Sequence, residues 1–148
     1  MIRREDLANE IAAYDKVKGE LALQAEECAR QGMYMAALAC LFILVELTLK
    51  EGLNQISGNF AMAIREARKT DLISKEEFKL LEELRLFRNG LFHENHYSRF
   101  ATDGKLLYQY SEDDTKELAY HQFAGPCLRL VLDITMPKKQ QKLTENKE

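Results

Sequence analysis

The sequence predicts an all-α protein, an up-and-down bundle of four to five helices. Apolar residues recur at alternating spacings of three and four, which is the period of amphipathic helices. Two prolines and seven glycines in 148 residues leave few breaks, as in helices joined by short connections. We expect one helical domain over residues 1–136 and a polar, disordered tail over residues 137–148.

Composition narrows the class of protein. A formal net charge of -3 argues against binding of nucleic acid by bulk charge, so any such contact would be local. Cys28, Cys40 and Cys127 fit neither a disulfide framework nor a zinc ribbon, which favours a reducing, cytoplasmic location. The charged first residues lack the apolar core of a signal peptide. The apolar run 33–50 is short and contains Glu46, so no membrane association is expected.

Two long antiparallel helices are predicted first. Gly32 ends the first helix, and the second runs from Met33 to Glu51, where Gly52 ends it. Val17 is expected to cover the one charged position on the apolar face of the first helix. That face comprises Leu7, Ile11, Tyr14, Lys18, Leu21, Ala25 and Cys28.

The remaining elements are predicted from local signals. A short third helix spans Phe60 to Lys69, and Ser74 with Glu77 has the capping-box spacing that begins a fourth. Residues 101–112 break the helical pattern, with a turn signal at Asp103-Gly104, and predict a loop or small hairpin. A last helix begins at Asp113 or Asp114 and runs to Ile134. Gly125-Pro126 should break or kink it.

The fourth predicted helix carries two different faces. Its docking stripe comprises Leu80, Leu84, Phe87 and Leu91. An adjoining arc mixes large apolar and polar side chains, namely Phe78, Leu81, Arg85, Arg88, Asn89, Phe92 and His93. Two interpretations of this arc remain open. It is either a core edge whose arginines reach water, or a face that meets a second copy of the chain around a polar pocket.

Three residues in the segment "LRLFRNGLFHENHY" supply the groups needed to cleave RNA without a metal. His93 can transfer protons near neutral pH. Arg88 can hold a phosphate and stabilise charge on its oxygens. Asn89 can fix either side chain by hydrogen bonds. Because one chain offers one such histidine, two copies fill the acid and base roles more easily.

The hexapeptide "RNGLFH", residues 88–93, resembles the R-N-x-x-x-H signature of HEPN domains, small helical bundles found in many prokaryotic toxins and defence proteins. The segment "YMAALACLFILVELTLKEGL" is similar to the apolar helix, acidic near its end, that packs beside the signature in that family. The resemblance implies a homodimer whose two signatures form one metal-independent endoribonuclease site. RNA is then the substrate, no cofactor is needed, and Arg88, Asn89 and His93 are the catalytic residues.

One departure from the family concerns regulation. Toxins paired with a nucleotidyltransferase antitoxin commonly carry a tyrosine two residues after the histidine, where this chain has Asn95, the nearest tyrosine being Tyr97. A neighbour-encoded antitoxin or regulatory protein is therefore a candidate partner only. The alternative function is a catalytically silent HEPN-like dimer that acts as an interaction, immunity or antitoxin module.

Three further residues near the signature have candidate roles in substrate binding. Arg85, His96 and Arg99 could guide a phosphate backbone, although each could equally be solvated. His93 and His96 lack the H-E-x-x-H spacing and a third ligand, so no metal site is predicted.

Glu46 is the candidate supporting residue. It lies in a very apolar helix and needs a cationic partner if it is buried. Arg88 and Arg85 are the candidates on the fourth helix, whereas Lys50, one turn further on, would form an ordinary surface pair.

Overall fold

The computed structural model describes residues 3–55, 58–91, 101–102, 105–106 and 112–137. Six helices lie in this part of the chain: α1 (Arg4–Tyr14), α2 (Lys16–Arg30), α3 (Tyr34–Gly52), α4 (Phe60–Lys69), α5 (Lys75–Asn89) and α6 (Glu112–Thr135). The predicted all-α bundle is confirmed. The turn at Asp103-Gly104 and the tail 138–148 lie outside the described residues.

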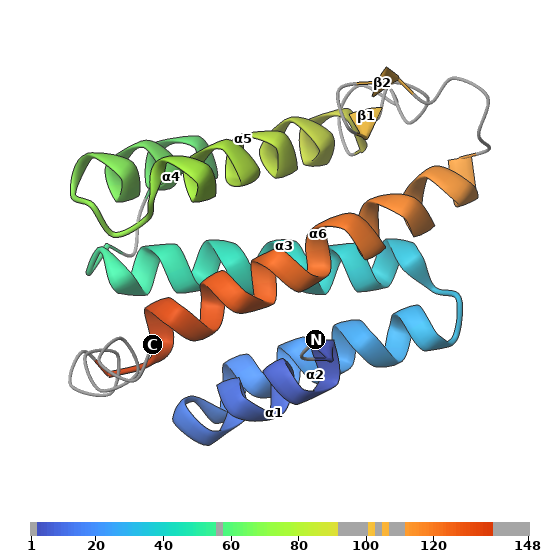
Figure 1. The fold of residues 1–148 in the computed structure, drawn as a ribbon, viewed down its shortest axis with the longest axis horizontal. Helices are drawn as coiled ribbons and strands as arrows, with labels where there is room; N and C mark the ends of the chain where they lie inside the picture. The colour runs from blue at the N-terminus through green and yellow to red at the C-terminus, as the bar shows by residue number, and fades with distance from the viewer. Residues whose placement is uncertain (1–2, 56–57, 92–100, 103–104, 107–111, 138–148) are drawn as a thin grey trace.

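α3 lies in the middle of the bundle and packs against α2, α4 and α6 (Figure 1). This position explains why its sequence is apolar nearly all round. Leu38, Leu41, Leu44, Val45 and Leu49 are each fully buried. Burial of one such side chain contributes roughly 1.5–3 kcal/mol. α3 therefore contributes much of the core on which the other helices dock.

The first predicted helix is two helices, so the prediction of one long helix was wrong. Asp15 has an extended backbone, with φ -148 and ψ 106, and its carboxylate accepts a hydrogen bond from the Lys18 backbone N–H at 3.1 Å. Asp15 thus ends α1 and caps α2. α1 then lies antiparallel against α2 (Figure 1). The apolar spacing continues through this break, which is why periodicity alone did not reveal it.

The break changes which side chains face the core. Val17, expected to cover the apolar face, is 61% exposed, whereas Lys18 is only 4% exposed. The Lys18 ammonium lies 2.7 Å from a carboxylate oxygen of Glu51 and 3.7 Å from one of Asp15. It also donates to the Thr135 hydroxyl at 3.3 Å. Lys18 therefore joins the start of α2 to the ends of α3 and α6.

Local signals gave most of the other helix ends correctly. Gly32 has a φ of 78 and ends α2, as predicted. α4 has the predicted bounds, and Ser74 and Glu77 form the predicted capping box at the start of α5. Gly52, however, belongs to α3. The turn falls at Asn54, whose φ is 56, because asparagine tolerates the left-handed conformation.

α6 is continuous from Glu112 to Thr135, so the helix does not break at Gly125-Pro126, and that part of the prediction was wrong. Phe123, Ala124, Cys127 and Leu128 flank the proline, and each is at most 1% exposed. Their burial offsets the backbone hydrogen bond that the proline cannot donate.

A minimal antiparallel pair replaces the helical pattern between α5 and α6. β1 (Ala101–Thr102) pairs with β2 (Lys105–Leu106), in the register Ala101 to Leu106 and Thr102 to Lys105. This agrees with the small hairpin that the sequence predicts. In the described part of the chain, no helix combines the length and apolar character needed to span a bilayer.

Candidate functional site

α5 carries Arg88 and Asn89 at its C-terminal end, and a stripe of buried side chains beside Arg88 docks the helix on the bundle. Leu81, Leu84, Phe87 and Leu91 are the buried residues of this segment, at 0%, 0%, 8% and 4% exposure. Leu81, which lies on the mixed arc, is buried in the core, as the core-edge interpretation of that arc expects, so its side chain is not available to a second copy. Leu80, assigned to the docking stripe, is only partly buried. The half-exposed face that remains contains Arg85, Arg88 and Asn89.

The Arg88 guanidinium lies between a carboxylate and an aromatic ring. Its Nη1 is 3.7 Å from Oε1 of Glu46 on α3. Its Cζ is 5.4 Å from the centre of the Phe60 ring at the start of α4. The side chain is 31% exposed, so solvent reaches it. Three helices therefore converge on the arginine of the signature.

One carboxylate oxygen of Glu46 forms ion pairs with two cations. Nζ of Lys50 is also 3.7 Å from Oε1 of Glu46, so both partners proposed from the sequence are present. Two cations and one carboxylate give this group a formal charge of +1. Arg85 does not join it, because Arg85 instead donates to Glu82 through Nη2 at 2.7 Å. Among the described residues, the Glu46 carboxylate thus restrains Arg88 and leaves this three-residue group with a net positive charge.

Asn89 closes α5, and the backbone beyond it stays helical. Gly90 has φ -60 and ψ -41, in the right-handed helical region, and Gly90 and Leu91 have π-helical geometry. Turns of this wider kind are frequent at functional sites. His93, His96 and Arg99 lie outside the described residues, as do Asn95 and Tyr97.

A second polar cluster was not found from the sequence. Glu26 is 9% exposed, accepts a hydrogen bond from Arg4 Nε at 2.8 Å, and accepts a short one from the Tyr120 hydroxyl. Burial, and then the bond to Glu26, raises the pKa of Tyr120. The available signal was the spacing of Glu26 from Ala22 and Ala29, which places a glutamate on a small-residue face of α2. This cluster ties α1 and α6 to α2.

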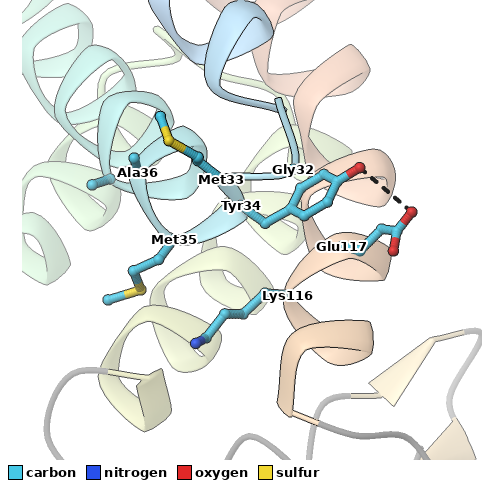
Figure 2. A pocket seen from close by; sticks show the side chains of 8 residues that line it. Gly32, Met33, Tyr34, Met35, Ala36, Lys116 and Glu117 are labelled. Carbon is cyan, nitrogen blue, oxygen red and sulfur yellow. Dashed lines mark hydrogen bonds between the residues drawn. The ribbon is translucent and has the colours of Figure 1, made fainter. Parts of the chain in front are cut away.

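Two hollows flank Tyr34 near the start of α3. One, of about 550 Å³, is lined in part by Arg4, Arg30 and His121. The other, of about 660 Å³, is lined by the Met33 and Met35 side chains and by Lys116 and Glu117 of α6 (Figure 2). The Tyr34 hydroxyl points toward Glu117 and lies 3.4 Å from its Oε1 (Figure 2). It is also 3.4 Å from Nε2 of His121.

Large apolar side chains are exposed near the Arg88 site. Ile43 on α3 is 55% exposed, and Leu86 on α5 is 60% exposed. Ile43 precedes Glu46 by three residues and therefore lies on the same side of α3. Leu86 precedes Asn89 by the same spacing on α5. Leu86 therefore lies beside Asn89, whereas Arg88, two positions from Leu86, points to another side of α5.

We compared the chain with protein-family models, with curated proteins and with solved structures, and found no significant match in any of them. The functional argument therefore depends on the residues of this chain.

Proposed function

We propose that this protein is a metal-independent endoribonuclease of the HEPN type, with Arg88, Asn89 and His93 as its catalytic residues. The observation that carries the proposal is the state of Arg88. Its guanidinium is held by Glu46 and Phe60, is 31% exposed, and belongs to a group with a formal charge of +1. A guanidinium that is restrained, reached by solvent and part of a net positive group can bind a phosphodiester.

The reaction uses the substrate's own nucleophile. The ribose 2'-hydroxyl attacks the adjacent phosphorus and loses its proton to one histidine, while the 5'-oxygen leaves with a proton from the other. The products are a 2',3'-cyclic phosphate and a 5'-hydroxyl. Arg88 stabilises the charge that grows on the phosphate oxygens. His93 from two copies supplies the base and the acid, and Asn89 orients the pair.

A homodimer is part of the proposal because two His93 side chains are needed. The exposed Ile43 and Leu86 support it, because large exposed apolar side chains on the helices that carry Glu46 and Asn89 favour association with a second copy. RNA is the substrate in this proposal, and a neighbour-encoded regulatory protein is a candidate partner only.

The test is cleavage of a labelled single-stranded RNA by purified protein in excess EDTA. We expect cleavage to proceed with chelator and the products to end in a 2',3'-cyclic phosphate. Cleavage that requires a divalent metal, or products ending in a 3'-hydroxyl, would contradict the proposal.

The second candidate function is a silent interaction module with the same dimer. The exposed apolar side chains favour it as well, because association does not require catalysis. Expression in a bacterial host separates the two. The nuclease arrests growth and His93→Ala relieves the arrest, whereas the silent module is harmless with or without that substitution.

A further inference from the structure

Phe60 is a core residue whose aromatic ring contacts the guanidinium of Arg88. It is the first residue of α4 and is 4% exposed. The Cζ atom of Arg88 is 5.4 Å from the ring centre, within the roughly 6 Å at which a guanidinium is attracted by an aromatic face. Ala63 and Ile64 on the same helix are also buried, so the ring stands on a well-packed support.

Glu46 restrains Arg88 less tightly than the common arginine–carboxylate pair does. The distance of 3.7 Å between Nη1 and Oε1 exceeds the roughly 2.7–2.9 Å of a charge-assisted hydrogen bond. The same oxygen is 3.7 Å from the Lys50 ammonium. If Arg88 turns toward a phosphate, Lys50 remains to neutralise Glu46. The ring, in contrast, can stay against one face of the guanidinium during that turn.

We infer that Phe60 is the positioning residue for Arg88 in RNA cleavage. Its cation–π contact holds the guanidinium where it can bind the phosphodiester. The inference deepens the proposed function and rests on it. Phe60 lies 28 positions before Arg88 on a different helix and belongs to no motif. It touches Arg88 rather than the substrate, so it acts through the arginine.

The substitution Phe60→Leu isolates the ring, because leucine keeps an apolar side chain in the core but has no aromatic face. The control is Ile64→Val, at a fully buried position one turn further along α4. It weakens the packing of α4 and leaves the ring in place. Thermal unfolding of both variants checks that each is folded at the assay temperature.

NMR spectroscopy detects the contact between Phe60 and Arg88 independently of any activity. We expect the side-chain Hδ and Hε resonances of Arg88, assigned by their absence in Arg88→Lys, to be shifted upfield by the Phe60 ring. The shift should vanish in Phe60→Leu and persist in Ile64→Val. An Arg88 resonance at its ordinary position in the wild type, or one unmoved by Phe60→Leu, would overturn the inference.

Kinetics tests whether the contact between Phe60 and Arg88 contributes to the cleavage rate. At saturating RNA, the single-turnover rate should fall roughly 2- to 30-fold in Phe60→Leu, the range expected for loss of one cation–π contact. RNA affinity and the Ile64→Val rate should change little. Equal rates in Phe60→Leu and wild type would refute the positioning role. If the wild type is inactive but the Arg88 chemical shift responds to Phe60→Leu, the proposed function is refuted. The contact between Phe60 and Arg88 is then still supported.

Discussion

Glu26 and Glu46 are both glutamates on helices with apolar faces, but their surroundings give them different roles. Glu26 is 9% exposed and accepts hydrogen bonds from both Arg4 and Tyr120. A buried carboxylate of this kind contributes to the fold only while its partners remain. Glu46 is 26% exposed and lies 3.7 Å from each of two cations. Its longer contacts suit a residue that restrains the arginine for which we propose a catalytic role.

Two tyrosines allow the role of Glu26 to be measured. Tyr120→Phe removes a hydroxyl that donates to a buried carboxylate and should lower the free energy of unfolding by about 1–3 kcal/mol. Tyr34→Phe is the matched control, because the Tyr34 hydroxyl reaches Glu117 only at 3.4 Å on an exposed edge. It should cost less than about 0.5 kcal/mol. Urea denaturation gives both values, and equal losses would mean that the buried bond adds nothing.

At the scale of the helices, the sequence predicted what local chemistry determines. The bounds of α4 and the capping box of α5 follow from residues within a few positions of each end. The break at Asp15 was missed because apolar spacing runs across it and one aspartate decides the turn. The continuity of α6 was missed because burial on both sides of Pro126 outweighs the local cost of proline.

The candidate site was predictable only in part. Arg88 and Asn89 were identified from their spacing, and Glu46 was identified as a charge that needs a partner. The sequence could not decide between Arg88 and Lys50, and the structure has both at the same distance. Phe60 could not be identified at all, because its contact with Arg88 depends on how α4 and α5 pack.

The close packing of α1 against α2 depends on a glycine, Gly19, which has no side chain. A Cβ at Gly19 would lie 2.3 Å from Cβ and 2.4 Å from Cα of Ala12, so the backbone would have to move. Gly19→Ala should therefore lower the free energy of unfolding by about 1–3 kcal/mol. Gly125→Ala in α6 is the control, since no atom outside its own chain neighbourhood lies within 4 Å.

The control should stay within about 1 kcal/mol of the wild type. The better helix propensity of alanine is partly offset by crowding with the proline that follows. Thermal or urea unfolding compares the two variants. A Gly19→Ala protein as stable as Gly125→Ala would show that α1 and α2 do not cross closely there.

At the scale of the whole molecule, the proposed homodimer makes a prediction about the exposed apolar side chain of Ile43, which is 55% exposed on α3. Ile43→Asp places a charge on the side of α3 that carries Glu46 and should turn the proposed dimer into a monomer. Val17→Asp is the control, because Val17 is 61% exposed on a different helix. Sedimentation at micromolar concentration should give a dimer for the wild type and for Val17→Asp. A wild-type monomer, or an Ile43→Asp dimer, would contradict this interface.

The central claim is that Arg88 and His93 cleave RNA, and the most direct measurement is the single-turnover cleavage rate of matched variants in EDTA. His93→Ala should lose roughly 10²–10⁴-fold, the usual contribution of general acid–base catalysis. Arg88→Lys should also fail, because a point charge does not reproduce the two-pronged contact of a guanidinium. Asn89→Ala should lose less. Arg68→Lys, at an arginine of α4 that is paired with Asp71, should retain most of the rate. Cleavage that persists at the wild-type rate in a protein carrying both His93→Ala and Arg88→Ala would contradict the account.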